Sequence, residues 1–403
     1  MSWAMRPVSQ LCILAVDCVN KTAPTVDFET PYKMIRTTNV KSGFVYLDDV
    51  RYVTEETFEK WTRRSKPMYG DVILSREAPV GEVGRFTSNE DGVFLGQRLF
   101  HYRPNPELLD WNYLAFVLQS HDVQGRLRGM GFGATVQHIK VPDAEHLIIP
   151  CPPIDTQRRI GSLLSAYDDL IENNRRRMVL LEQAARQLYS EWFVRLRFPG
   201  HEHTPITDGV PDGWDKTTAF AVMEVLSGGT PKTIVADYWG GEIPFYTPKD
   251  ASDAPYVLQT ERSITELGLK NCNSRLYERD TVFISARGTV GKLNLASHPM
   301  AMSQSCYALV GKGHVSQLFL FCALGEAIDY FKQHAVGAVF DAIVVDTFKL
   351  IPFTVPDEKL VRRFEDAAVP MFRQIANFME QNQKLRAARD LLLPRLMSGE
   401  IAV

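Results

Sequence analysis

The chain has 403 residues, of which 45% are hydrophobic and 23% charged, so it is long enough for two or three globular domains and is neither fibrous nor disordered. Its formal net charge of −3 excludes a protein covered by one basic face, so contacts to nucleic acid would have to come from local clusters. The six cysteines are scattered without C-x-x-C pairs, which predicts reduced thiols, a cytoplasmic location and no metal site. No apolar run approaches the ~20 residues of a membrane span.

Residues 1–152 alternate short β-type runs with glycine and proline turns. The β-type runs include 44–47, 51–53, 71–74 and 92–95. Helical patterning appears at about 54–64, with Thr54 as the expected N-cap, and at about 108–120. The sequence therefore predicts a mixed α/β domain.

Basic and amide side chains stand on the predicted loops of this domain. One follows the strand at 71–74, two follow the strand at 92–95, and three belong to a segment expected to be a basic, glycine-rich loop. They are Arg76, Gln97, Arg98, Arg126, Arg128 and Gln137. Arginine can bond guanine and glutamine can bond adenine in a bidentate way, so such loops suit base edges and phosphates. Any one of these residues is more typical of a solvated surface, so the prediction depends on their clustering.

Residues 153–197 carry a heptad pattern, in which apolar residues alternate at steps of three and four. The seam consists of Ile160, Leu164, Tyr167, Ile171, Met178, Leu181, Leu188 and Trp192. Ala185 continues the pattern, and Asn174 fills one core place. A helix that covers the seam would be roughly 50 Å long at about 1.5 Å per residue. That length exceeds what one small domain needs for its own core and predicts partner helices.

Residues 198–213 are rich in proline and glycine and predict a linker, after which residues 214–353 repeat the first domain in looser form. Val80-Gly81 matches Val290-Gly291, and Gln97 matches Gln304. The loops differ, and their candidate nucleic-acid contacts are Lys232, Lys249, Arg287 and Gln304. Two domains with like cores and unlike loops are what a protein that reads two different targets needs.

Residues 354–403 repeat the helical seam 204 positions after the first, so that Ile375 corresponds to Ile171. The second seam consists of Phe364, Met371, Ile375, Phe378, Leu385 and Leu392, with Asn382 and Arg389 at two core places. Pro370 is expected to kink this helix or to mark the first turn of a new one. Two unrelated amphipathic helices are the alternative, but two matching seams favour an internal duplication.

Signatures of catalysis are missing from the sequence. It contains no G-x-x-x-x-G-K-[ST] loop and no Asn/Asp-Pro-Pro-aromatic motif of amino-methyltransferases. No carboxylate, Cys/His or Ser/His arrangement stands out. We therefore expect that the chain is not itself an enzyme.

Several segments resemble the DNA specificity subunits of type I restriction–modification systems. They are residues 17–24, 76–81, 96–98, 153–160 and 391–401. The resemblance covers nearly the whole chain and implies a prokaryotic, cytoplasmic, non-catalytic subunit. It implies two α/β target-recognition domains, separated by two long antiparallel coiled-coil helices and related by an internal pseudo-twofold repeat. Each domain would read one half of a bipartite, asymmetric DNA site.

The resemblance also implies partners. Two modification subunits would dock on the helices and use S-adenosylmethionine to methylate adenine, and restriction subunits would use ATP and Mg²⁺. The chain itself is expected to bind double-stranded DNA but no cofactor, metal or membrane. Base-contacting residues do not transfer through the resemblance, so the candidates above, together with Lys21, rest on loop position and side-chain chemistry.

Two other classes of function stay open. The chain could be a scaffold or decoy that binds the methyltransferase without reading DNA, in which case its complex would show no sequence preference. It could instead be a self-contained enzyme, which methyl transfer by the isolated chain would reveal.

Overall fold

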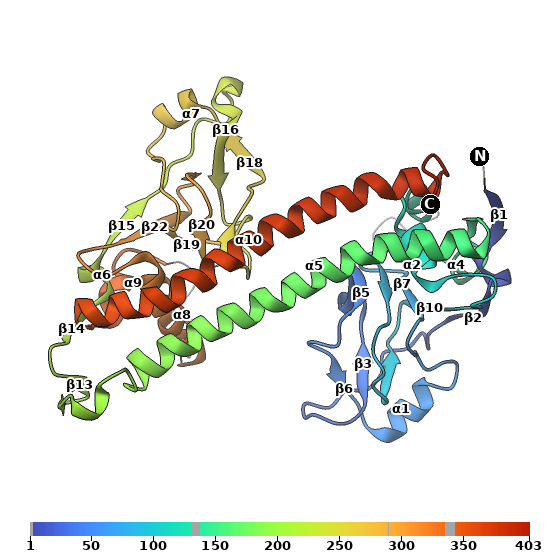
Figure 1. Cartoon of the computed structure of the whole chain (residues 1–403), viewed down its shortest axis with the longest axis horizontal. Coiled ribbons are helices and arrows are strands. Elements are labelled where there is room, and N and C mark those ends of the chain that lie inside the picture. Colours follow the sequence, from blue (N-terminus) through green and yellow to red (C-terminus); the bar gives the residue numbers. More distant parts are fainter. Residues whose placement is uncertain (1–2, 130–137, 289, 335–342) are drawn as a thin grey trace. The chain divides into compact units, whose positions relative to one another are not determined.

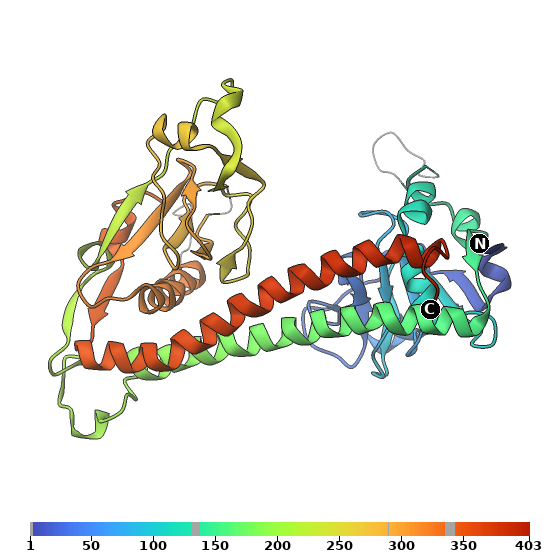
Figure 2. The same cartoon turned by 45° about the horizontal axis from the view of Figure 1, so that its top comes forward.

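The computed structural model describes residues 3–129, 138–288, 290–334 and 343–403, which form two compact units (Figures 1 and 2). Unit 1 consists of Met1–Glu172 and Gln383–Val403, and unit 2 consists of Asn173–Asn382. There are two long helices, α5 (Ile154–Tyr189) and α10 (Glu358–Met397). Each of them has one segment in unit 1 and one segment in unit 2. Both units are mixed α/β, as the sequence predicts.

The main sheet of unit 1 has the strand order β2-β10-β7-β8-β5-β4, with α2 packed on one face. These elements are β2 (Cys12–Asp17), β10 (Leu99–Pro104), β7 (Val72–Ser75), β8 (Val83–Arg85), β5 (Gly43–Val45), β4 (Val40–Lys41) and α2 (Trp111–Gln119). A second sheet, β6-β3-β9, comprises β6 (Arg51–Tyr52), β3 (Lys33–Ile35) and β9 (Val93–Leu95), and β1 (Ala4–Pro7) pairs with β11 (Ile148–Cys151). The short helices are α1 (Glu55–Trp61), α3 (His121–Gly129) and α4 (Val141–Glu145).

Unit 2 repeats this topology. Its main sheet has the order β15-β22-β19-β20-β17, with β15 (Met223–Ser227), β22 (Cys306–Gly311), β19 (Val282–Ser285), β20 (Leu293–Ala296) and β17 (Tyr256–Val257). Its second sheet, β18-β16-β21, comprises β18 (Arg262–Ile264), β16 (Trp239–Tyr246) and β21 (Ala301–Met302). Two-stranded pairs form between β14 (Asp215–Thr218) and β23 (Pro352–Val355), and between β12 (Ile206–Thr207) and β13 (Val210–Pro211). The helices are α6 (Ala219–Val222), α7 (Glu266–Lys270), α8 (Gln317–His334) and α9 (Thr347–Leu350).

Matching backbone hydrogen bonds confirm the internal repeat residue by residue. The N–H of Arg76 donates to the Arg98 carbonyl at 2.8 Å, and the N–H of Ala286 donates to the Ser305 carbonyl at 2.9 Å. Gln97 and Gln304 each precede the accepting residue, so their predicted correspondence is confirmed. The Gly81 N–H to Ser75 bond likewise recurs between Gly291 and Ser285, at 2.9 Å in both units.

The two predicted helices of the first domain exist, although they are shorter than expected. Thr54 caps α1 by accepting a bond from the N–H of Thr57 at 3.4 Å, as predicted, and the helix ends at Trp61. Helix α2 begins after Asp110, whose carboxylate accepts from the N–H of Tyr113 at 2.8 Å. A side-chain acceptor at the N-cap satisfies an N–H that the first helical turn leaves unpaired, which explains where each helix begins.

The segments of α5 and α10 within each unit pair antiparallel. In unit 1, Ile160 and Leu164 share a core with Leu396, whereas Asp168 contacts Arg389, so the numbering rises on one helix as it falls on the other. In unit 2, Asn174 contacts Asn382, and Tyr189 packs on Phe364 with ring centroids 5.9 Å apart. The predicted antiparallel pair is therefore confirmed within each unit.

The predicted seam lies at this helix interface. Ile160, Leu164, Phe364, Ile375 and Phe378 are buried. The other seam residues are half-buried, namely Tyr167, Ile171, Met178, Leu181, Leu188, Trp192, Met371, Leu385 and Leu392.

Of the two alternatives predicted for Pro370, the first turn of a new helix is wrong, and a kink stays a prediction. Helix α10 is continuous from Glu358 to Met397, with Pro370 exposed inside it. A proline removes the hydrogen bond to the carbonyl four residues earlier, which here belongs to Asp366. Asp366 is exposed as well, so its carbonyl lies on the solvent side of the helix.

Asp71 is the centre of a buried polar network in unit 1. Its carboxylate accepts from Nε of Arg103 at 2.9 Å, lies 2.6 Å from Nε2 of His101, and accepts from the N–H of Met68 at 2.8 Å. Burial raises the pKa of Asp71, but the hydrogen bonds from Arg103 and His101 outweigh burial and hold the pKa below its ordinary value of 3.8.

We expect this network to make stability depend on pH. A carboxylate with a lowered pKa in the folded state stabilises the protein above its unfolded pKa, and this contribution is lost as the pH falls through the folded pKa. Asp71→Asn should therefore lower the free energy of unfolding by about 1–3 kcal/mol at pH 7. Below about pH 4 the difference from wild type should shrink. Urea unfolding at pH 7 and pH 3 measures this, and an equal difference at both pH values would contradict the assignment.

Candidate nucleic-acid interface

Three predicted residues of unit 1 come together where β2 ends and β10 begins. The Thr22 hydroxyl lies 3.3 Å from Oε1 of Gln97, which brings the loop that carries Lys21 beside the Gln97-Arg98 turn. Lys21 and Arg98 are exposed, and Gln97 is half-buried. We call Lys21, Gln97 and Arg98 the first loop cluster.

A carboxylate that sequence reasoning missed holds one member of this cluster in place. Glu77 Oε2 lies 2.9 Å from Nε of Arg98. The bond fixes the guanidinium at the end of β7 while the Arg98 side chain remains 44% exposed. Glu77 stood next to a candidate residue in the sequence, but only the fold shows that it faces Arg98.

Arg76 lies beneath the cluster. Its side chain is only 5% exposed, and its Nη1 donates to the Ile139 carbonyl at 3.0 Å. Its backbone carbonyl also accepts from the N–H of Ile139 at 3.0 Å, so residue 139 covers the arginine. Arg76 follows the strand, as predicted, but its side chain is buried and its observed contacts support the loop. The DNA contact predicted for it stays a prediction.

Arg126 and Arg128 lie on helix α3, which corrects the prediction that they stand on a loop. Arg126 donates from Nη1 to the Ile148 carbonyl at 2.6 Å and from Nη2 to Asp122 at 3.1 Å, so its guanidinium is committed within unit 1. Gln137, the remaining candidate of this segment, lies outside the described residues.

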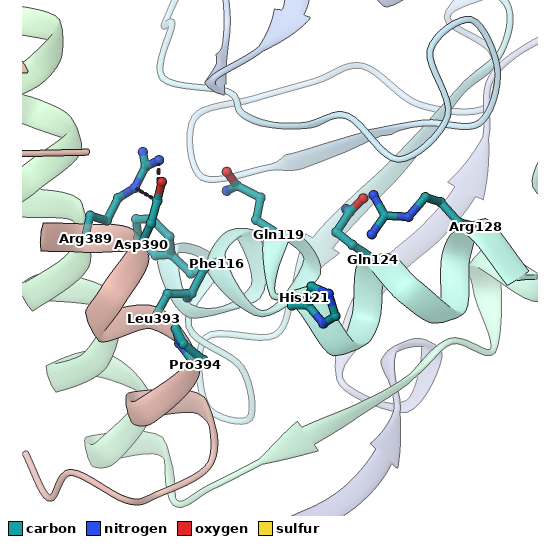
Figure 3. Close-up of a pocket in the computed structure, with 9 residues that line it drawn as sticks. All are labelled: Phe116, Gln119, His121, Gln124, Arg128, Arg389, Asp390, Leu393 and Pro394. Atoms are coloured by element: carbon teal, nitrogen blue, oxygen red, sulfur yellow. Dashed lines mark hydrogen bonds and ion pairs between the residues drawn. The ribbon is translucent and has the colours of Figure 1, made fainter. Parts of the chain in front are cut away.

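Arg128 lines an open pocket of about 370 Å³ between helices α2, α3 and α10 of unit 1 (Figure 3). The pocket is lined by Phe116, Gln119, His121, Gln124, Arg128, Arg389, Asp390, Leu393 and Pro394. Gln124 donates to the Gly81 carbonyl at 2.8 Å, which connects this wall to the loop after β7. Arg389 is paired with Asp390, so among the described residues Arg128 is the lining cation without a carboxylate partner.

The candidates of unit 2 form a corresponding group. Arg287 follows Ala286, which is bonded to Ser305, the neighbour of Gln304. A Cβ at Gly288 would lie 3.6 Å from the Cβ of Pro248, the residue before Lys249. Lys249, Arg287 and Gln304 are all exposed and are called the second loop cluster.

Lys232 is exposed on the loop that follows β15. The N–H of Gly229, on the same loop, donates to the Met302 carbonyl at 3.1 Å, two residues before Gln304. The Lys232 carbonyl accepts from the indole N–H of Trp239 at 3.3 Å, so the backbone of the loop is held while the Lys232 side chain is exposed.

The two clusters differ in charge at equivalent positions. The shared backbone pattern aligns Glu77 with Arg287 and Arg98 with Ser305. Unit 1 therefore presents an acid paired with an arginine. Unit 2 presents Arg287, which makes no ion pair with any residue that the structure describes. One scaffold thus carries two chemically different surfaces.

The described parts of the chain contain no group of histidine, cysteine and acidic residues able to hold a metal ion. Within the same residues, no helix is both long enough and apolar enough to cross a membrane.

Comparison with known proteins points to one family. Residues 3–183 and 211–366 match the type I restriction modification DNA specificity domain. The type I restriction enzyme MjaIX specificity subunit of Methanocaldococcus jannaschii is 23% identical over 374 residues, which cover 89% of this chain and 84% of that protein. The type I restriction enzyme HindI specificity subunit of Haemophilus influenzae is 21% identical over 397 residues, which cover 82% of this chain and 86% of that protein.

The fold is also similar to a solved structure. The crystal structure of a type I restriction–modification S subunit from M. genitalium superposes with a TM-score of 0.58 at 17% identity. The match covers 98% of this chain and 96% of that one, so the likeness extends over both units.

Proposed function

Because the chain belongs to the type I restriction modification DNA specificity family, we propose that each of its units binds one half of a bipartite, asymmetric DNA target. The observation that carries this proposal is the repeated scaffold with two unlike loop clusters. A repeated scaffold supplies two similar binding surfaces, and the exchange of Glu77 for Arg287 gives them different chemistry. This family is defined by DNA specificity, in agreement with the expectation that the chain is not an enzyme.

Gln97 and Gln304, at equivalent positions, are suited to bidentate contacts with adenine, and Arg98 and Arg287 to contacts with guanine. Residues 198–350, the part of unit 2 outside the long helices, give little general attraction for phosphates, because they contain 12 Lys and Arg against 17 Asp and Glu. We expect a further subunit to supply phosphate contacts, so tight DNA binding should need the assembled complex.

We also propose that two modification subunits dock on the α5 and α10 segments. Leu163 and Leu170 of unit 1 are 39% and 52% exposed and lie seven residues apart, hence on one side of α5. In unit 2, Val179 and Leu180 of the same helix are 41% and 64% exposed. Apolar side chains exposed along a helix are typical of a surface that receives a partner. S-adenosylmethionine would then bind the modification subunits, ATP and Mg²⁺ would bind restriction subunits, and this chain would bind no cofactor.

A third part of the proposal concerns spacing. Helices α5 and α10 both continue from one unit into the other. We propose that the number of residues in these two helices sets the number of base pairs between the two half-sites. The relation is analogous to the way dimer geometry sets half-site spacing in other DNA-binding proteins.

Alanine substitutions of Arg98 and Arg287 test the base-reading role. Each should weaken binding of the cognate DNA by about 1–3 kcal/mol and relax specificity at one position within its own half-site. Fluorescence anisotropy of the chain assembled with its modification subunit, on cognate and substituted duplexes, measures both effects.

Arg279→Ala is the matched control, because Arg279 precedes β19 whereas Arg287 follows it, so the two arginines lie at opposite ends of one strand. The control should bind like wild type. Unchanged binding by both test variants would remove these arginines from the interface. Equal binding of the wild-type complex to all sequences would favour a scaffold that does not read DNA.

A further inference from the structure

Buried polar contacts join α5 and α10 at two levels of an otherwise largely apolar seam. In unit 1, Nη1 of Arg389 lies 2.5 Å from Oδ1 of Asp168, which is 1% exposed. In unit 2, the Asn174 amide donates to Oδ1 of Asn382 at 2.9 Å, and both residues are buried. Buried polar groups are costly unless they are paired, so each member of these contacts needs its partner on the opposite helix.

Asp168 has a second partner from the sheet of unit 1. Nη2 of Arg85, which is 2% exposed, lies 2.7 Å from Oδ2 of Asp168, and its Nη1 donates to Asn112 at 3.0 Å. The guanidinium carbon of Arg85 also lies 4.4 Å from the ring centroid of Phe44. We call Arg85, Asp168 and Arg389 the buried triad.

The equivalent positions of unit 2 are entirely apolar. The N–H of Ile139 donates to the Arg76 carbonyl, and the N–H of Ile343 donates to the Ala286 carbonyl. Ile139 and Ile343 are therefore equivalent, at a shift of 204 positions, and the long helix that follows each of them is compared at the same shift. This shift places Phe372 where unit 1 has Asp168, and Ala185 where it has Arg389. Arg85 of β8 pairs with Val72 of β7, and Leu295 of β20 pairs with Val282 of β19. Because Val282 is the equivalent of Val72, Leu295 occupies the position of Arg85. Leu295, Phe372 and Ala185 are buried in one hydrophobic core.

Because of this difference, the polar residues of α5 or α10 would lose their partners if the helix paired with a second copy of itself. In an α5·α5 pair with the same register, Asp168 would face Ala185 and keep only Arg85, and Asn174 would face Met178. In an α10·α10 pair, Arg389 would face Phe372 and Asn382 would face Phe378. Each polar contact between the helices is therefore lost in both like-with-like pairs. It is satisfied when α5 pairs with α10.

We propose that Asp168–Arg389 and Asn174–Asn382 form a pairing code by which α5 selects α10 and rejects a second α5. Buried asparagines and complementary charges are known means of fixing the register and partner of paired helices. The code makes α5 pair with an α10 and not with the α5 of another copy. One subunit therefore keeps two different recognition surfaces, and two identical ones are not combined. This inference concerns folding and assembly and does not depend on DNA binding.

Stability alone does not require this polar set. Replacing a buried ion triad with well-packed apolar residues is often neutral or stabilising, and unit 2 shows an apolar set in the same fold. Selection between partners is the property that the polar set adds, because an apolar seam accepts either helix equally well.

The test uses the full chain with a protease site inserted between Asp208 and Gly209, at the exposed turn between β12 and β13. The folded protein is cut there, unfolded in urea and refolded, and native mass spectrometry then counts the pairs. Wild type should give almost only pairs of one N-terminal and one C-terminal half, with like-with-like pairs below about one in a hundred.

The matched variant carries the apolar set of unit 2 at all five positions. Its changes are Arg85→Leu, Asp168→Phe, Arg389→Ala, Asn174→Phe and Asn382→Met. With the polar contacts removed, pairing should become nearly random, so about half of all pairs should be like-with-like. Abundant like-with-like pairs from wild type would overturn the proposal, and so would exclusive mixed pairs from the variant.

Intact chains give a second measurement that does not require the halves to refold. After refolding at high concentration, the five-fold variant should form a larger fraction of dimers in light scattering than wild type does, because only the variant tolerates α5·α5 and α10·α10 pairs. If the five-fold variant does not fold, Asn174→Phe with Asn382→Met retains the buried triad and should give an intermediate fraction. A purely monomeric product from a folded variant would contradict the pairing code.

Discussion

Asp168→Ala is expected to lower the free energy of unfolding by about 3–5 kcal/mol, because it leaves Arg85 and Arg389 without their shared carboxylate. Arg85 is 2% exposed, so water cannot readily replace the lost partner. Removal of the partner of a buried charge costs far more than removal of an exposed ion pair. Urea unfolding of the full chain at pH 7 measures the change.

A triple variant separates the loss of the ion pair from the loss of packing. Arg85→Leu, Asp168→Phe and Arg389→Ala together reproduce the apolar set of unit 2, and the stability should return to within about 1 kcal/mol of wild type or exceed it. Arg158→Ala is a control for an exposed pair on the same helix, because Arg158 and Asp155 are both mostly exposed, and it should change stability by less than about 1 kcal/mol. If Asp168→Ala costs no more than this control, the triad is not a buried electrostatic unit.

Insertion of one heptad into each long helix, after Met178 and after Asn377, is expected to abolish methylation of the original DNA target. These sites lie next to each other in unit 2, where Arg177 packs on Phe378 at 5.7 Å, so the insertion keeps the seam and the contact between Asn174 and Asn382. Each helix becomes about 10 Å longer. At about 3.4 Å per base pair, this corresponds to roughly three additional base pairs between half-sites.

The added base pairs also rotate one half-site by about 100°, given roughly 10.5 base pairs per turn. The variant should therefore either methylate a target with a longer spacer or lose activity, while it remains folded and still binds the modification subunit. Size-exclusion chromatography of the complex provides the folding control. Continued methylation of the original target with its original spacer would show that helix length does not set the spacing.

Much of the fold was predictable because its signals are periodic. The heptad steps placed Ile160, Leu164, Ile375 and Phe378 in a buried interface, and the shift between Ile171 and Ile375 indicated the duplication. These patterns follow directly from helix geometry, so no knowledge of distant contacts is needed to recognise them.

The candidate site was less predictable because its features depend on contacts between distant segments. Arg76 stands at the end of a strand in the sequence, yet residue 139 covers it in the fold. Arg389 occupies a core position of an apolar seam, for which the sequence gives no partner. Only the fold shows that Asp168 contacts both Arg389 and Arg85. Arg126 and Arg128 lie close to several glycines, which suggested a loop, but their segment forms helix α3.

Methylome sequencing of cells that express this chain with its modification subunit tests the central claim most directly. We expect methylated adenines in a two-part motif with a fixed spacer. Exchange of Arg287 and Gln304 for other polar residues should alter one part of that motif, while the other part and the spacer stay unchanged. Variants of Gln97 and Arg98 should alter only the opposite part. A change in both parts from substitutions in one cluster, or a continuous motif read by a single unit, would contradict the account.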